Sequence, residues 1–240
     1  MKVSKIIAIV LAILLAAALG AIGRLYYIGR LSFIHPMQTA TEGQIKVACV
    51  GDSVTYGFGI HNRTKNNYPA VLNKLLGDGY CVNNFGYSGR TVSPDGDRPY
   101  IEEALYQQSI EFQPDIIILM LGSNDSKPYN WDRETFPAHY ENLLNRYQSL
   151  TSQPKIYIML PPPAFAHNGE VKYDIQPEVI KNHIVPMTQL LADKYDLPCI
   201  DLYTLFEDKS ALLSDGLHPD ADGAKLIAQT VYEALTADEA

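Results

Sequence analysis

The segment "GDSVTYG", residues 51–57, places Ser53 directly after a run of apolar residues. A serine in that position either starts a turn or acts as a nucleophile. A sharp turn after a strand exposes the hydroxyl and directs backbone N–H groups at the group that it attacks. A nucleophilic serine also needs a general base to take its proton. The segment alone therefore does not separate the two roles, and the base must be sought elsewhere in the chain.

The segment "SDGLHPD", residues 214–220, contains the best candidate for that base, His218. Asp215 lies just before it, Gly216 permits a tight turn and Pro219 fixes the exit, so one short loop can bring the carboxylate and the imidazole together. A carboxylate that accepts the Nδ1 proton leaves Nε2 free to take the serine proton. The alternative is a surface loop that caps the last helix of the chain.

Two further segments carry groups that can donate hydrogen bonds to a negatively charged oxygen. Gly86 in "NNFGYSG" has no Cβ, so its N–H can approach a reacting carbonyl closely. Asn124 in "GSND" follows an apolar run and carries a side-chain amide. With the Ser53 N–H, these groups would provide three donors to a developing oxyanion. The alternative is that glycine and asparagine simply end strands in turns.

Short apolar runs alternate with longer segments of helical pattern from Ile45 onward, which predicts a three-layer α/β/α domain. Several runs are apolar throughout, as is typical of parallel strands covered on both faces. The polar segments follow the first three runs, at the sheet edge where such folds bind ligands. The predicted strands are 45–50, 80–85, 115–121, 155–160 and 198–202, and the predicted helices are 67–76, 99–112, 134–151, 177–195 and 221–235.

The four segments resemble, in their order and their places at strand ends, the four sequence blocks of the SGNH hydrolases, also called the GDSL superfamily. The resemblance covers the whole predicted domain. It implies a flavodoxin-like sheet of five parallel strands, with Ser53 as nucleophile, His218 as base and Asp215 as the support of the base. It also implies an oxyanion hole formed by Ser53, Gly86 and Asn124. The implied reaction is ester hydrolysis through an acyl-serine, without a metal or cofactor.

Composition limits the partners of the chain. Its 240 residues suit one globular domain preceded by a short N-terminal segment. The 19 Lys and Arg residues against 27 Asp and Glu residues give a formal charge of -8, which argues against nucleic acid as a partner. Cys49, Cys81 and Cys199 lie within apolar runs, so we interpret them as buried thiols rather than as metal ligands or a disulfide framework.

An uncharged apolar segment, residues 6–23, follows two lysines near the N-terminus. It is longer than the roughly 7 to 15 residues of a signal-peptide core and close to the roughly 17 to 25 residues of a spanning helix. We therefore expect a hydrophobic helix that exports the domain and anchors it in the membrane, facing outside. Cleavage before Ala21, which would release the protein, is the alternative. The expected division is a signal-anchor or signal peptide over 1–23, a linker over 24–44 and the hydrolase domain over 45–236.

Two segments near the expected site, "SPDGDRPY" (93–100) and "NDSKPYNW" (124–131), add aromatic rings and cationic side chains. They are similar to segments of SGNH carbohydrate O-acetylesterases, including proteins labelled sialate O-acetylesterase-like. The similarity implies an acetyl ester of a small sugar or oligosaccharide as the substrate, and Arg90 or Arg98 is a candidate to meet a substrate carboxylate. The residues expected to contact the substrate are Asp52, Tyr56, Arg90, Arg98 and Trp131.

Three other functions stay open on the sequence. A lysophospholipase or thioesterase of the same superfamily would need an elongated apolar groove, part of which "PPPAFAH" (161–167) would supply. A membrane-tethered sugar-binding module would keep the fold without the chemistry, although all of the expected reactive residues are present. A surface O-acetyltransferase would share the site but needs an acetyl-importing membrane domain, which a single span does not supply.

Overall fold

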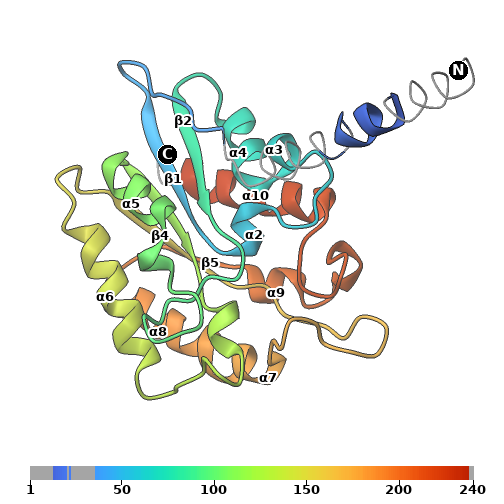
Figure 1. The fold of residues 1–240 in the computed structure, drawn as a ribbon. Coiled ribbons are helices and arrows are strands. Elements are labelled where there is room, and N and C mark those ends of the chain that lie inside the picture. The colour runs from blue at the N-terminus through green and yellow to red at the C-terminus, as the bar shows by residue number, and fades with distance from the viewer. Residues whose placement is uncertain (1–12, 21, 23–35, 238–240) are drawn as a thin grey trace, which may run out of the picture. The chain divides into compact units, whose positions relative to one another are not determined.

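The computed structural model shows two units, residues 1–36 and residues 37–240 (Figure 1). The residues that it describes are 13–20, 22 and 36–237.

In the N-terminal unit, residues 13–20 and 22 are helical. The remainder of the predicted segment 1–23 and most of the predicted linker lie outside the described residues. Within the described ranges, no helix is long and apolar enough to cross a membrane.

A sheet of five parallel strands, in the order β2-β1-β3-β4-β5, forms the centre of the second unit (Figure 1). This order is that of flavodoxin-like doubly wound sheets, in which ligands bind beyond the carboxyl ends of the strands where the order reverses. Here the reversal falls between β1 and β3. The predicted five-stranded parallel sheet is confirmed. The strands are β1 (Ile45–Gly51), β2 (Tyr80–Gly86), β3 (Ile116–Met120), β4 (Lys155–Leu160) and β5 (Cys199–Asp201).

Helices cover both faces of the sheet, which explains why several strand segments are apolar throughout. Along β1, Val47 and Cys49 belong to one buried cluster, and Ala48 and Val50 belong to the other. Successive side chains of a strand point to opposite faces, so both faces of β1 are buried. The predicted three-layer arrangement is confirmed. One face carries α4 (Tyr68–Leu76), α9 (Leu202–Phe206) and α10 (Ala221–Ala237), and the other carries α5 (Ala104–Glu111), α6 (Phe136–Gln148) and α8 (Val185–Lys194).

Two predicted helices are interrupted. The predicted helix 99–112 consists of a 3-10 turn, η1 (Tyr100–Glu102), followed by α5, because Glu103 between them is extended. The predicted helix 177–195 consists of α7 (Pro177–Val179), a π-helical turn, η3 (Ile180–Ile184), and α8. Pro186 has no N–H to continue the hydrogen-bond ladder, and the π turn comes directly before this break. The remaining short elements are α2 (Ser53–Tyr56), α3 (Arg63–Asn66), η2 (Ser123–Ser126) and η4 (Ser210–Leu212).

The described end of the predicted linker packs on the edge strand β2. The Gln38 N–H donates to Asn83 Oδ1 at 2.8 Å, and Asn83 Nδ2 donates to Gln38 O at 2.9 Å. Gln44 Nε2 donates to Asp78 O at 2.8 Å. Residues 37–44 therefore belong to the same unit as the sheet.

Candidate active site

Ser53 begins α2, a single helical turn directly after β1. Asp52 caps this turn, because its Oδ1 accepts the Val54 N–H at 3.0 Å. Gly57 ends the turn in the left-handed conformation, with its N–H donating to Ser53 O at 3.0 Å. The turn holds Ser53 at the carboxyl edge of the sheet, beside the point where the strand order reverses.

His218 and Asp215 lie in one tight loop before α10. Asp215 Oδ1 accepts the backbone N–H groups of Leu217 at 3.0 Å and of His218 at 2.8 Å. Gly216 turns the chain with a φ of 88°, and a Cβ there would lie 2.2 Å from Phe165 O, so glycine is required for both reasons. The loop therefore fixes the carboxylate against the imidazole, as the sequence predicted for this turn.

The side chains of Ser53, His218 and Asp215 are joined in series. Ser53 Oγ lies 2.9 Å from His218 Nε2, and His218 Nδ1 lies 2.7 Å from Asp215 Oδ2. Ser53 and His218 are both buried, so little water competes for these contacts. The structure thus brings together three side chains that come from opposite ends of the domain.

Two aromatic rings, from Tyr173 and Phe58, hold the imidazole of His218. The Tyr173 ring packs edge-on against His218 with centroids 5.2 Å apart, and the Phe58 ring lies 4.6 Å from it. The Tyr173 hydroxyl donates to Asp215 Oδ2 at 2.8 Å. Sequence reasoning missed both aromatic residues. Phe58 directly follows the segment 51–57, and the loop that carries Tyr173 has no periodicity and no recognisable motif.

Hydrogen bonds decide the ionisation of Asp215. Burial alone would raise its pKa, but the His218 ring, the His218 backbone N–H, the charge of His218 and the Tyr173 hydroxyl hold the pKa of Asp215 well below its usual range. Partial burial and the Asp215 carboxylate raise the pKa of Tyr173 to about 12. The carboxylate therefore stays ionised and the phenol stays a proton donor at neutral pH.

A pocket of about 180 Å³ borders Ser53. Its wall combines the reactive groups with aromatic, glycine and cationic residues. The lining residues are Ser53, Phe58, Ser88, Gly89, Arg98, Asn124, Lys127, Tyr173, Leu217 and His218.

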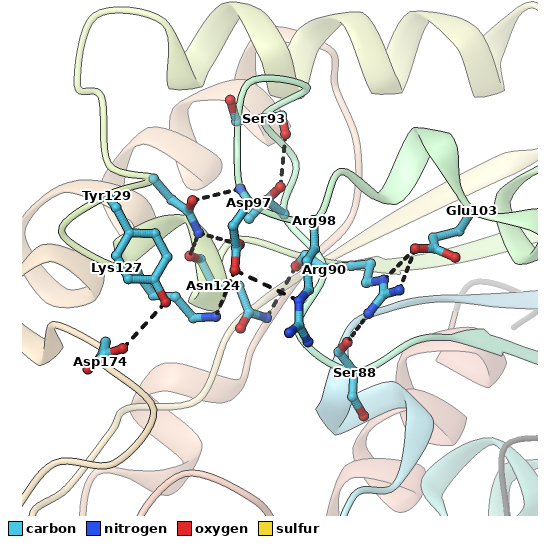
Figure 2. A network of polar contacts seen from close by, with 12 residues as sticks. Ser88, Arg90, Ser93, Asp97, Arg98, Glu103, Asn124, Lys127, Tyr129 and Asp174 are labelled. Atoms are coloured by element: carbon cyan, nitrogen blue, oxygen red, sulfur yellow. Dashed lines mark hydrogen bonds and ion pairs between the residues drawn. The ribbon is translucent and has the colours of Figure 1, made fainter.

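Asn124 lies in this pocket, in the η2 turn that follows β3. Its Nδ2 donates to Arg90 O at 3.2 Å (Figure 2). The same Nδ2 donates to Asp52 Oδ2 at 3.2 Å, and the backbone carbonyl of Asn124 accepts Asn130 Nδ2 at 2.9 Å. These contacts fix the amide in the pocket wall beside Ser53. Both hydrogen bonds from the Asn124 amide, at 3.2 Å, lie at the upper end of the usual range. The amide can therefore also donate a hydrogen bond to an incoming oxyanion at small cost.

Gly86 does not line the pocket, contrary to the prediction from the sequence. Its N–H donates to Asn84 Oδ1 at 2.9 Å. A Cβ on Gly86 would lie 2.4 Å from Tyr56 N, so glycine is needed there to let β2 pass directly against α2. Gly89, in the turn that follows β2, lines the pocket instead. The segment "NFGYSG" contains both glycines, and only the path of the loop distinguishes them.

Replacing Gly86 by alanine should therefore destabilise the domain rather than act on the chemistry directly. A clash with backbone atoms should lower the free energy of unfolding by about 3 kcal/mol, which corresponds to roughly 6 to 12 °C in Tm for a domain of this size. Gly79→Ala is the matched control, because a Cβ there meets no atom within 4 Å. Thermal unfolding followed by circular dichroism measures both variants. Equal Tm values for the two variants would contradict the packing role of Gly86.

Arg98 is one of the five predicted substrate contacts, and the structure places it in the pocket wall. Asp52 is only 1% exposed, and its two oxygens accept hydrogen bonds from Val54 and Asn124. Tyr56 is buried, with the Arg63 guanidinium 3.9 Å from its ring centroid. Asp52 and Tyr56 therefore support α2 and do not line the pocket.

Arg90 and Trp131 also lie outside the pocket lining. Arg90 forms an ion pair with Glu103 and lies 3.7 Å from the Tyr87 ring centroid, so its guanidinium is already engaged (Figure 2). Trp131 stacks on His183 with ring centroids 5.6 Å apart and packs against the core. Both side chains hold loops in place, and neither confirms the expected substrate contact.

Two buried carboxyl groups, Asp52 and Asp125, lie behind the pocket wall. Asp125 accepts the backbone N–H groups of Ser93 at 2.9 Å and of Val92 at 3.0 Å. Burial raises the pKa of Asp52 to about 6 and the pKa of Asp125 to about 7, and the nearby Asp52 contributes to the second shift. Both groups thus take up a proton in the folded state at a pH at which the unfolded chain is still ionised.

These raised pKa values predict how stability depends on pH. Between about pH 4 and pH 7 the folded state binds more protons at these two groups than the unfolded chain, so their contribution is fully present below about pH 4 and is lost as the pH rises to 7. Wild type should therefore lose about 2 to 3 kcal/mol more than Asp125→Asn between pH 5 and pH 8. Urea unfolding at a series of pH values measures this difference, with the exposed Asp208→Asn as control. Parallel curves for wild type and Asp125→Asn would contradict it.

The fold and the site together define a doubly wound α/β domain with a serine, a histidine and an aspartate in series at the carboxyl edge of its sheet. The chain belongs to the GDSL-like lipase/acylhydrolase family, whose family model matches residues 49–226.

Among curated proteins, the chain is 38% identical over 213 residues to an acetylxylan esterase of Xylanibacter ruminicola, and the match covers 81% of this chain and 44% of that protein. The chain thus spans less than half the length of this relative.

Two solved structures have the same fold. A carbohydrate acetylesterase family member from Sinorhizobium meliloti is 25% identical with a TM-score of 0.64, and the match covers 81% of this chain and 98% of that one. A lipase/acylhydrolase from Enterococcus faecalis is 24% identical with a TM-score of 0.63, and the match covers 81% of this chain and 97% of that one. At 24% identity, the similarity to the Enterococcus faecalis structure concerns the fold alone.

Proposed function

We propose that this protein is a serine esterase that hydrolyses small acyl esters, in particular acetyl groups on carbohydrates. The observation that carries the proposal is the series of contacts from Ser53 Oγ through His218 to Asp215, in the wall of a small pocket. The acetylxylan esterase relative and the carbohydrate acetylesterase structure support a carbohydrate as the alcohol part of the ester.

In the first half of the reaction, Ser53 Oγ attacks the carbonyl carbon of the ester while His218 Nε2 takes the serine proton. The carbonyl oxygen becomes an oxyanion, and we assign its hydrogen-bond donors as the N–H groups of Ser53 and Gly89 and the Asn124 amide. The bond to the alcohol oxygen then breaks, and His218 gives its proton to that oxygen. The alcohol leaves and the acyl group stays on Ser53.

In the second half, a water molecule replaces the alcohol. His218 takes a proton from the water as the water oxygen attacks the acyl carbon, and Ser53 Oγ leaves with the proton that His218 returns. The products are the carboxylic acid and the free serine. Asp215 stays ionised in both halves, because its pKa is held well below its usual range, and so stabilises the imidazolium.

The size of the pocket favours an acetyl group over a long acyl chain. Its 180 Å³ is small beside the roughly 300 to 1,000 Å³ of pockets that enclose drug-sized ligands. The segment 161–167, from which a lipid-cleaving enzyme would need a groove, does not line it. Phe165 from that segment is partly buried against the core, and its N–H donates to Gly216 O at 2.7 Å. These observations support the acetylesterase over the lysophospholipase or thioesterase.

Rates on esters of different acyl length test this choice. We expect kcat/KM for p-nitrophenyl acetate to exceed that for p-nitrophenyl decanoate by about 100-fold or more, since a pocket of fixed length rejects added methylenes. We also expect the enzyme to release acetate from acetylated xylan. A clear preference for chains longer than about eight carbons would support the lipid acyl hydrolase instead. Absence of hydrolysis of every ester, with sugar binding retained, would support the inactive binding module.

We also propose that residues 1–23 export the domain and hold it at the membrane, facing outside. The large apolar side chains among the described residues of this segment are all exposed, so they have an apolar surface to bury: Ile13, Leu14, Leu15, Leu19 and Ile22. Membrane fractionation and intact mass of the protein from its host test this. A soluble protein that lacks the segment would show that it is a cleaved signal peptide.

A further inference from the structure

Lys127 places a buried ammonium group in the pocket wall. Its side chain is only 9% exposed, yet the residue lines the pocket beside Ser53. Among the described residues, the carboxylate closest to Lys127 Nζ is that of Asp97, at 3.9 Å, which is beyond hydrogen-bond range. A buried charge is normally paired and hydrogen-bonded, because removing it from water is costly. The ammonium group therefore has room for a closer anion on its pocket side.

Arg98 brings a second positive charge to the same pocket. Its side chain is 62% exposed, and its Nε lies 3.9 Å from Asp97 Oδ2, again beyond hydrogen-bond range. Figure 2 shows Asp97 between Lys127 and Arg98, so that one carboxylate faces two cations. Asn130 fixes the position of this carboxylate, because its Nδ2 donates to Asp97 Oδ1 at 2.8 Å and its Oδ1 accepts the Asp97 N–H at 2.8 Å.

The lining of the pocket is therefore unbalanced in charge. Arg98 and Lys127 line it, whereas no Asp or Glu does so within the described part of the chain. The other carboxylates nearby do not line it: Asp174 accepts the Tyr129 hydroxyl at 3.4 Å, and Asp52, whose pKa the Lys127 charge lowers against the effect of burial, is buried behind Asn124. An anionic group that enters the pocket meets two cations that the protein itself neutralises only in part.

We propose that Lys127 and Arg98 bind a carboxylate on the substrate, so that the preferred substrates are acetyl esters of sugar acids rather than of neutral sugars. Lys127 supplies a fixed point charge, and Arg98 supplies a planar fork that matches a carboxylate and can adjust to it from the exposed rim. The inference rests on the proposed function, because the same pocket presents the ester to Ser53. It also separates the two arginines that the sequence offered, since Arg90 is paired with Glu103.

The test compares two substrates that differ in one charge: a methyl glucuronoside with a single O-acetyl group, and the C6 methyl ester of the same compound. We expect wild type to prefer the free acid by about tenfold or more in kcat/KM, as for loss of one charged contact. Lys127→Met should bring the ratio close to one, Lys127→Arg should keep most of it, and Arg98→Gln should lower it. Arg133→Gln, an exposed residue outside the pocket lining, is the control that should keep the wild-type ratio.

Each other outcome has a distinct meaning. If wild type hydrolyses p-nitrophenyl acetate but releases acetate from the C6 methyl ester compound as fast as from the free acid, the proposed carboxylate site is wrong. The proposed esterase function then still holds. If it hydrolyses p-nitrophenyl acetate but neither sugar, the sugar-acid assignment is also wrong. If it hydrolyses no ester, the proposed function fails together with the inference. If Lys127→Met does not fold, Arg98→Gln provides the test instead. A second measurement compares methyl glucuronoside with methyl glucoside as competitive inhibitors of p-nitrophenyl acetate hydrolysis. The glucuronoside, which carries the carboxylate, should inhibit at the lower concentration.

Discussion

Ser53→Ala should lower kcat for p-nitrophenyl acetate by about 10⁴- to 10⁶-fold, as removal of the nucleophile does in other serine hydrolases. In the proposed mechanism, Ser53 Oγ forms the acyl-enzyme, and His218 Nε2 has no other serine oxygen at 2.9 Å among the residues that the structure describes. Pre-steady-state kinetics measures the loss, because the burst that reports acylation should disappear with the turnover.

Ser88→Ala is the matched control for this variant. Ser88 also lines the pocket, but its Oγ is buried and has no hydrogen-bond partner in the described part of the chain. Its replacement should cost less than about tenfold in kcat, since a hydroxyl without a base is not activated. A loss at Ser88 equal to the loss at Ser53 would contradict the assignment of the nucleophile.

Asp215→Asn should lower kcat by about 10³- to 10⁴-fold while leaving the fold intact. The asparagine oxygen can still accept the N–H groups of Leu217 and His218 that shape the loop. Its amide, however, would place a donor against His218 Nδ1 and favour the tautomer that cannot take the serine proton. It would also remove the negative charge that stabilises the imidazolium.

Steady-state kinetics and thermal unfolding of Asp215→Asn separate chemistry from stability. We expect kcat to fall with little change in KM or Tm. Tyr173→Phe is a useful companion, because it removes one of the hydrogen bonds to Asp215 Oδ2 and should lower kcat far less. A variant whose loss of activity follows its loss of Tm would instead show that Asp215 acts only in folding.

The strands and the main site residues could be predicted because each leaves a local signal. Strands buried on both faces are continuous apolar runs, and the residues that follow the first and third runs, Ser53 and Asn124, meet wherever parallel strands end at one edge. The Asp-Gly-Leu-His turn carries its own geometry, and the structure places His218 and Asp215 accordingly. For Ser53 and Asn124, the strand that precedes the residue was enough to predict its place in the pocket wall.

The rest of the pocket depends on contacts that no local pattern reveals. Gly86 ends β2 and Gly89 follows in the next turn, and only the passage of β2 against α2 decides that Gly89 faces the pocket. Arg90 and Arg98 look alike in the sequence, but Arg90 is occupied by Glu103. Tyr173 reaches Asp215 from a loop without periodicity. Partners distant in sequence settle such questions, and a single sequence does not contain them.

Covalent labelling of Ser53 tests the central claim most directly. Treatment with a fluorophosphonate ester should add one organophosphorus group per protein and abolish hydrolysis of p-nitrophenyl acetate in step with labelling. Peptide mass spectrometry should place the group on Ser53, and Ser53→Ala should take up none. A label on another serine, or full activity in protein that is fully labelled at Ser53, would contradict the account.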